Sequence, residues 1–273
     1  MHLPSKSEME MLDMFEGLTI RDAVIKSILN DERWYGDGSP QWTISAKKPW
    51  QRPSQMAAQA REQHDKTERL LDRHGSNDPY ASHLIKSIER CHPNRHCGSG
   101  ACPECQRALQ RWFVENVHDA AAALLKDKRK LILVSIVPDY AATDATRPNL
   151  NWENVIAKLC EDMASVGIPW AIGGSDFSVN IDKVNGGDPV LQGQFWMLIE
   201  KPKGNWSDDL KALINSSGKI KKPLFKRKYA SSHAQLAYAI KNEFNKRETY
   251  IKRTKLRNPH MNTRKKSFVA IFG

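Results

Sequence analysis

The chain has 273 residues, and its 42 Lys and Arg against 31 Asp and Glu give a formal net charge of +11. This length allows a sizeable core, in one large domain or in a domain with an appendage. No segment approaches the roughly 18 consecutive apolar residues of a membrane span, and the N-terminus lacks the apolar run of a secretory signal. We therefore expect a cytoplasmic protein without a membrane partner, in which clustered cysteines bind metal rather than each other.

The positive charge lies almost entirely in the last quarter of the chain. Residues 201–273 carry 19 Lys and Arg against 4 Asp and Glu, whereas residues 1–200 carry 23 against 27. Such an asymmetry predicts a polyanionic partner, with nucleic acid favoured over an acidic membrane surface. A basic segment that only keeps the chain soluble is the alternative interpretation.

The N-terminal third of the sequence predicts a helical region. Two short helices are expected within residues 6–30, and an irregular loop with three tryptophans follows at residues 31–53. A longer helix is expected from Ser54, which caps it, to Gly75, which ends it. A helical turn or two at residues 80–90 then leads into a cysteine-rich segment.

Four of the five cysteines fall within that short segment, CHPNRHCGSGACPEC. Their spacing suits a tetrahedral zinc shell, which needs ligands folded back within a few ångströms. His92 or His96 could replace one of the cysteines. Four protein ligands leave no position for water, so the Zn²⁺ is expected to be structural. The ligands that we predict are Cys91, Cys97, Cys102 and Cys105.

After a strong helix at residues 106–125, the pattern changes to strands alternating with helices. We predict a strand at 131–138, a helix at 151–167, strands at 170–182 and 190–200, a helix at 207–218, a strand at 222–230 and a helix at 231–253. This order predicts an α+β fold, a ferredoxin-like or RRM-like split βαβ domain whose antiparallel sheet is backed by helices. The fifth cysteine, Cys160, lies on an amphipathic helix and is expected to be buried.

A cysteine knot followed by an Arg-containing helix and this strand order resembles the plasmid rolling-circle replication initiators, the Rep proteins of the HUH endonuclease type. Their opening apolar strand is matched by LILVSIVPD at residues 131–139, and their Tyr-x-x-Lys helix by Tyr238-Ala239-Ile240-Lys241. The resemblance covers roughly residues 88–247. It suggests a division into a helical region at 1–90, a zinc knot and long helix at 91–130, a Rep-like domain at 131–247 and a basic tail at 248–273.

The central motif of the Rep family departs from its pattern in this sequence. The family's His-x-His segment aligns with Gln194-Phe195-Trp196, which contains no histidine. The resemblance implies that Tyr238 would be the nucleophile, with Lys241 beside it and Asp176 as the acidic metal ligand. Amide and indole groups do not replace imidazole as metal ligands, so we expect the nicking activity to be lost.

Basic residues interleaved with aromatic ones make the C-terminal quarter a candidate nucleic-acid interface. Lysine and arginine release counterions from phosphates, and neighbouring aromatic rings can stack on bases. A solvated charged face is the alternative. The residues that we expect to bind nucleic acid are Lys221, Lys222, Lys226, Arg227, Lys228, Lys241, Lys246, Arg247, Lys252, Arg253, Lys255 and Arg257.

The sequence therefore predicts a DNA-binding protein of a plasmid, phage or transposable element, with a zinc-stapled and catalytically degenerate Rep-like domain. DNA is the expected partner, single- or double-stranded, together with other replication or transposition proteins. An active nickase that uses Tyr238 is one alternative. An RNA-binding module is a weaker one, in which Phe177, Phe195 and Trp196 would stack bases if they face solvent.

Overall fold

The structure is a computed structural model, which describes Trp34 and residues 53–75, 79–92, 95–99, 102–145, 149–182, 187–240, 245–252 and 260–267. The two helices expected within residues 6–30, and the following loop apart from Trp34, lie outside the described residues. The chain divides into two compact units. The helical unit comprises Met1–Asp127, Ser231–Ala237 and Ile271–Gly273, and the sheet unit comprises Lys128–Ala230 and Tyr238–Ala270.

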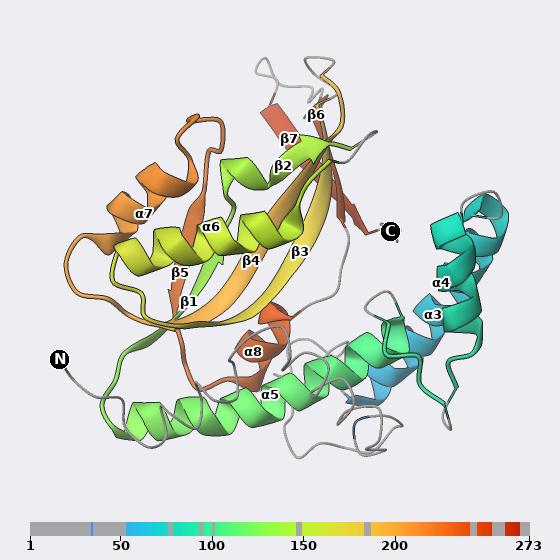
Figure 1. Cartoon of the computed structure of the whole chain (residues 1–273), viewed down its shortest axis with the longest axis horizontal. Helices are drawn as coiled ribbons and strands as arrows, with labels where there is room; N and C mark the ends of the chain where they lie inside the picture. Colours follow the sequence, from blue (N-terminus) through green and yellow to red (C-terminus); the bar gives the residue numbers. More distant parts are fainter. Residues whose placement is uncertain are drawn as a thin grey trace. The chain divides into compact units, whose positions relative to one another are not determined.

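The helical unit contains three helices in the part of the chain that the structure describes, and all three agree with the sequence patterns. They are α3 (Pro53–Gly75), α4 (Pro79–Glu89) and α5 (Pro103–Lys126) (Figure 1). Helix α5 begins at Pro103, where proline is well suited because the first helical N–H has no partner in any case. Leu71, Ile85 and Ile88 from α3 and α4 are buried in a common core with the start of α5.

The sheet unit has an α+β fold, as predicted. Its elements are β1 (Leu131–Ile136), the short helix η3 (Asp139–Ala141), β2 (Ala142–Asp144), α6 (Trp152–Ser165), β3 (Ala171–Asp182), β4 (Val190–Glu200), α7 (Trp206–Ile214), β5 (Leu224–Lys228), β6 (Asn245–Lys252) and β7 (His260–Ser267). The strand order is β5-β1-β4-β3-β6-β7, with β2 paired to β4. The neighbours among β5, β1, β4 and β3 are all antiparallel, and β6 joins β3 in parallel.

Helices α6 and α7 cover one face of this sheet (Figure 1). Helix α6 begins at Asn151, whose side chain accepts a 3.0 Å hydrogen bond from the N–H of Asn154. Its buried residues include Val155, Leu159 and Met163, at the spacing that places side chains on one side of a helix. They meet apolar side chains of β1 and β4, so the main core of the unit lies between the helices and the sheet.

A glycine allows the closest approach of α6 to the sheet. A Cβ atom at Gly193 of β4 would lie 2.8 Å from the indole ring of Trp152, the first residue of α6. That ring stacks on Phe195 with an interplanar angle of 4° and also contacts Phe177. Glycine at position 193 therefore lets the indole lie flat against the sheet.

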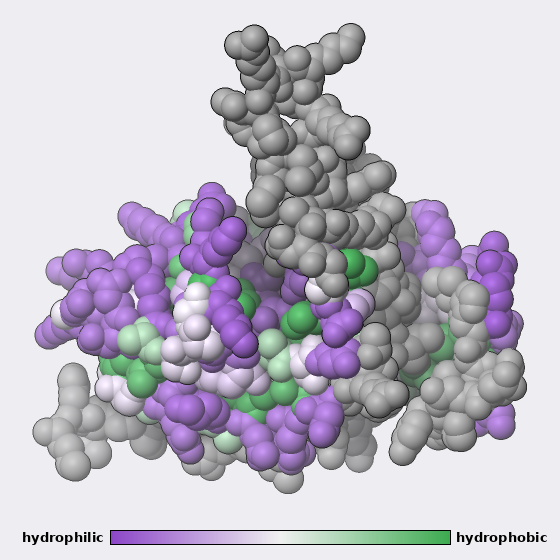
Figure 2. Space-filling view, turned by 90° about the horizontal axis from the view of Figure 1, so that it is seen from above, coloured by the Kyte–Doolittle hydropathy of each residue, from purple (hydrophilic) through white to green (hydrophobic). Residues whose placement is uncertain are grey.

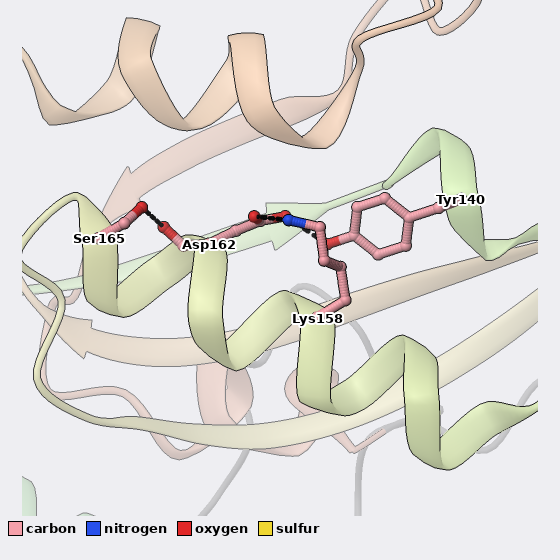
Figure 3. A network of polar contacts seen from close by, with 4 residues as sticks. All are labelled: Tyr140, Lys158, Asp162 and Ser165. Atoms are coloured by element: carbon pink, nitrogen blue, oxygen red, sulfur yellow. Dashed lines mark hydrogen bonds and ion pairs between the residues drawn. The ribbon is translucent and has the colours of Figure 1, made fainter.

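One charged side chain is buried on the inner side of α6. The carboxylate of Asp162 is 3% exposed, accepts a 2.9 Å hydrogen bond from the Tyr140 hydroxyl and pairs with the ammonium of Lys158. Figure 3 shows these side chains pointing toward one another, with Ser165 donating to the Asp162 carbonyl. Burial, followed by the hydrogen bond to Asp162, raises the pKa of Tyr140, so the phenol keeps the proton that it donates.

Two sequence-based expectations are wrong. The helix expected at residues 231–253 is much shorter: α8 (His233–Ala239) ends early, and Asn245–Lys252 forms β6. The Thr-Tyr-Ile run in β6 favours a strand, and the free edge of β3 provides backbone partners, so tertiary pairing overrides the helical pattern. Cys160 is exposed rather than buried, because it lies beside the buried stripe of α6 and not within it.

Hydrophilic side chains dominate the described surface in Figure 2, with hydrophobic side chains in small groups between them. Among the helices that the structure describes, none combines the length and the apolar character that crossing a bilayer requires.

Candidate metal centre and candidate nucleic-acid interface

The four cysteines predicted as metal ligands come together in the helical unit. Their Sγ atoms all lie within 4.8 Å of one another. The separations are 3.5 Å between Cys91 and Cys102, 3.6 Å between Cys91 and Cys105, and 3.7 Å between Cys97 and Cys105. A metal–sulfur bond of about 2.3 Å in a tetrahedral shell gives sulfur–sulfur distances of about 3.8 Å, whereas a disulfide needs about 2.05 Å. The cluster therefore has the dimensions of a metal shell and not of two disulfides.

Helix α5 and a tight loop position these sulfur atoms. Cys102 immediately precedes α5 and Cys105 lies in its first turn, where the N-terminal end of a helix stabilises negative charge. The N–H of Gly98 donates to the Cys105 sulfur at 3.3 Å, and the N–H of Ser99 donates to the Cys97 sulfur at 3.4 Å. Gly98 has a φ of +65°, a backbone conformation that glycine adopts without strain. These N–H donors favour thiolates over thiols.

The protons of the thiols are strongly coupled. Hydrogen bonds from Cys102 and then from Cys105 lower the pKa of Cys91, whereas the hydrogen bonds of Cys102 to Cys105 and Cys91 raise the pKa of Cys102. Packed sulfur atoms of this kind share protons that a soft divalent cation would displace on binding. The arrangement is compatible with a metal site.

The histidine alternatives do not join the cluster. Among the described residues, the ligand atoms that gather within 4.8 Å are those of the four cysteines, and neither His92 nor His96 is part of the group. A second group of possible ligands, His64, Asp65 and Glu68, lies on α3. The Nε2 atom of His64 is within 3.1 Å of the Ile88 carbonyl, and both carboxylates are exposed, so this group is a surface feature of the helix.

The cysteine cluster forms the centre of the core of its unit. Cys91, Cys102 and Cys105 are buried, and the residues packed with them come from α3, α4, α5 and the loop at Trp34. The carbonyl of Trp34 accepts a 3.1 Å hydrogen bond from the guanidinium of Arg111 on α5. A metal held there would join elements that otherwise share little apolar surface, which is a structural role.

The candidate nucleic-acid interface lies on the face of the sheet opposite α6 and α7, which we call the polar face. In an antiparallel pair, residues directly opposite each other point to the same side. Asp176 of β3 lies opposite Gln194 of β4, and Trp196 lies opposite Gly174 on one side and Ser135 on the other. The Gln194 amide donates a 2.6 Å hydrogen bond to the Ser135 hydroxyl.

The polar face brings together most of the residues that the Rep resemblance singled out. The Tyr238 ring packs edge-on against Trp196, with centroids 4.8 Å apart and an interplanar angle of 89°. A Cβ atom at Gly174 would lie 3.3 Å from the Ala239 carbonyl oxygen, so glycine admits the end of α8 to β3. Asp176 is 5% exposed on the same face, two residues from Gly174. Lys241 lies outside the described residues.

Aromatic side chains are distributed unequally between the two faces. Phe225 of β5 lies on the polar face, 6.2 Å from the Trp196 ring, and is 53% exposed. Phe177 and Phe195 instead pack on Trp152 on the helix side. Of the three aromatic residues that the RNA-binding alternative would use, only Trp196 lies on the polar face.

The basic residues expected to bind nucleic acid fall into three sets. Lys221, Lys222, Arg227 and Lys228 are exposed at or near β5. Lys226 is engaged on the helix side, where its ammonium donates to the Ser207 hydroxyl at 2.9 Å and lies 5.4 Å from the centre of the Trp206 ring. The others lie in β6, whose side chains are not described, or outside the described residues: Lys241, Lys246, Arg247, Lys252, Arg253, Lys255 and Arg257.

The sequence analysis missed a basic group at the end of the sheet. The N–H of Lys201 donates a 2.7 Å hydrogen bond to the carbonyl of Lys130, which holds these two exposed lysines side by side. Lys128 precedes them in the chain and Lys203 follows, both exposed. Charge counts along the sequence could not reveal this group, because the pairing of β1 with β4 assembles it from segments 70 residues apart.

Comparison of the chain with protein-family models, with curated protein sequences and with solved structures finds no significant match. The resemblance to Rep proteins therefore rests on the motif residues and on their positions in the sheet unit.

Proposed function

We propose that the chain is a DNA-binding protein of a plasmid or another mobile element, built on a Rep-like domain that has lost its nicking chemistry. The observation that carries this proposal is the packing of Trp196 against Tyr238. The resemblance assigns the position of Trp196 to a metal-binding histidine and that of Tyr238 to the nucleophile. A large indole edge-on to the phenol leaves the family's residue pair in place and replaces its chemistry.

The strand order supports the Rep-like part of the proposal. The order β5-β1-β4-β3, with α6 between β1 and β3 and α7 between β4 and β5, is the arrangement of a split βαβ domain of the ferredoxin-like type. In such a domain the second strand of the central hairpin carries the Rep metal-binding motif, which corresponds to β4. The positions of Gln194 and Trp196 on β4 fit that correspondence.

The side chains present also argue against metal-assisted nicking. A metal ion that polarises the scissile phosphate contributes several kcal/mol to transition-state stabilisation. The amide nitrogen of Gln194 already donates to Ser135, and an indole offers no ligand atom. Tyr238 would therefore attack a phosphate without the group that stabilises the developing charge.

We infer that the metal of the cysteine cluster is Zn²⁺ and that it is structural. Thiolate ligands in a closed tetrahedral set favour zinc over magnesium or calcium, which prefer oxygen ligands. The sulfur–sulfur separations of 3.5–3.7 Å suit this ion. With four protein ligands, the ion would hold α4 and the start of α5 together without taking part in a reaction.

Positive charge supports DNA as the partner. The exposed lysines before β5 and at the end of the sheet supply the phosphate contacts that dominate the affinity of such complexes. Binding should therefore weaken steeply as salt rises. Replacing Lys221 and Lys222 by Gln should lower the slope of log Kd against log salt by about 2 for duplex DNA. The matched control is the double replacement of Lys66 and Lys86, two exposed lysines of the helical unit, which should leave the slope unchanged.

Two measurements test the proposal. Fluorescence anisotropy with labelled DNA at several salt concentrations measures binding, and loss of all DNA binding in the wild-type protein would reject the proposed function. Incubation with single-stranded and supercoiled DNA and Mg²⁺ or Mn²⁺ tests the nickase alternative. We expect no covalent protein–DNA product. A product that disappears in Tyr238→Phe would establish the nickase instead.

A further inference from the structure

Three aromatic side chains form a continuous strip on the polar face. Trp196 of β4 lies between Phe225 of β5 and Tyr238 of α8, with ring centroids 6.2 Å and 4.8 Å apart. Phe225 is 53% exposed and Tyr238 is 39% exposed. The other large hydrophobic side chains exposed among the described residues, Ile156, Val190 and Leu213, belong to different elements. Contiguous exposed aromatic rings, in contrast to scattered apolar residues, mark a binding surface.

Positive charge borders this strip. Arg227 is two residues from Phe225 along β5, so both side chains point to the polar face, and Arg227 is exposed. The lysine group at Lys130 and Lys201 lies beyond Arg227, where β1 and β4 meet the end of the sheet. The acidic groups on this part of the sheet are engaged or covered, since Glu200 pairs with Arg129 and Asp176 is buried.

Exposed π faces next to cations select a ligand that is planar, aromatic and anionic. Unpaired nucleobases on a phosphate backbone have these properties, whereas a duplex hides the faces of its bases within the stack. We propose that the Phe225–Trp196–Tyr238 strip stacks the bases of single-stranded DNA, with Arg227 contacting the adjacent phosphate. This inference rests on the proposed DNA-binding function and adds the strand state of the partner. It also gives Tyr238 a new role, in which its ring is used and its hydroxyl is not.

The test compares a fluorescein-labelled oligothymidine of about 16 nucleotides with a hairpin duplex of matched length, using the full chain. Phe225→Ala should weaken oligothymidine binding about tenfold, as expected for one lost stacking contact, and change duplex binding less than twofold. Phe225→Trp should restore the affinity. Leu213→Ala is the matched control, because Leu213 is 40% exposed on α7 at the other face of the sheet.

Tyr238 provides a second test that separates stacking from chemistry. Tyr238→Phe keeps the ring and should leave oligothymidine affinity within twofold, whereas Tyr238→Ala should weaken it about tenfold. Arg227→Gln should lower the salt slope for the single strand by about 0.7, the value for one phosphate contact.

Distinct outcomes would overturn this inference. If the wild-type chain binds neither DNA, the proposed function and the strip both fail. If both DNAs bind but Phe225→Ala and Tyr238→Ala change nothing, only the strip fails. Binding of oligouridine without oligothymidine would assign the strip to RNA. Loss of a dimer in Phe225→Ala, measured by sedimentation, would assign it to a second copy of the chain.

Discussion

The helical unit and the sheet unit surround cores of different composition. Among the described residues, the core of the helical unit contains eight buried side chains, of which three are the cysteines Cys91, Cys102 and Cys105. The core of the sheet unit contains fourteen buried apolar residues and no cysteine. Sulfur atoms in a cluster contribute stability mainly when a metal joins them, whereas apolar residues contribute it by leaving water. The comparison indicates that one unit depends on an ion for its fold and the other does not.

The largest expected effect comes from removing the ion. Cys102→Ser should lose the metal and unfold the helical unit, because structural zinc contributes about 10 kcal/mol or more, as much as the whole stability of many domains. Elemental analysis should give one zinc per chain in the wild-type protein and less than half of that in the variant. Amide hydrogen exchange should show protection lost in α3, α4 and α5 and kept in β1 and β4.

The matched control is Cys160→Ser, because Cys160 is exposed and lies outside the cluster. This variant should keep both the zinc and the protection of α5. Full zinc content in Cys102→Ser, or equal loss of protection in β1 and α5, would contradict the comparison.

The reciprocal change removes apolar volume from the sheet unit. Leu210→Ala on α7 empties a fully buried site and should lower the free energy of unfolding by about 2–5 kcal/mol without loss of zinc. Leu213→Ala, three residues along the same helix and exposed, should change it by about 0.5 kcal/mol or less. Urea unfolding of the two variants checks the difference, and similar values for both would show that α7 does not pack as described.

A smaller effect is expected from the buried carboxylate of α6. Tyr140→Phe removes the hydroxyl that donates to Asp162 and should lower the free energy of unfolding by about 1–3 kcal/mol, because a buried carboxylate loses a partner. Lys158→Gln should cost less, about 1 kcal/mol, since Lys158 is half exposed. Urea unfolding measures both. A larger loss in Lys158→Gln than in Tyr140→Phe would reverse the order of the two contacts.

The smallest effect concerns a pair of histidines in the helical unit. His118 and His233 stack with ring centroids 3.7 Å apart, and burial, followed by the charge of His118, lowers the pKa of His233. The unfolded chain therefore binds the proton more tightly than the folded chain. The contribution to stability is present above about pH 6.5 and is lost as the pH falls below that value.

His233→Phe keeps the ring stack and removes this titration. Its free energy of unfolding should fall less than that of the wild-type protein between pH 7.5 and pH 5.5. Because the cysteine ligands are the same in both proteins, their own proton uptake cancels in the difference. Parallel curves for the two proteins would mean that His233 does not titrate in this range.

Features encoded by local spacing could be predicted from the sequence. The four cysteine ligands follow from spacing alone, and α6 follows from its cap at Asn151 and its apolar period. The strands β1, β3 and β4 are apolar or alternating runs bounded by turn residues, which is a local signal. The position of Gln194 and Trp196 on one face of β4 follows from the alternation of a strand.

Features that depend on distant pairing could not be predicted. The strand β6 exists because the edge of β3, more than 60 residues earlier, accepts it, and no local pattern at Asn245–Lys252 announces that edge. The strip of Phe225, Trp196 and Tyr238 comes from three separate elements. Cys160 was misjudged because its place at the border of the α6 stripe depends on the exact angle at which the helix lies on the sheet.

The division of the chain has a consequence for the order in which the protein is made. The helical unit contains residues 1–127 and also Ser231–Ala237, so the sheet unit interrupts it in the sequence. The late segment contributes real contacts, since the Gln110 amide donates a 2.7 Å hydrogen bond to the Ala237 carbonyl and His233 stacks on His118. On the ribosome, the cysteines emerge and can take up their ion while most of the sheet is still untranslated. The unit that begins to fold first must then wait for β1 to β5 to be synthesised before it is complete.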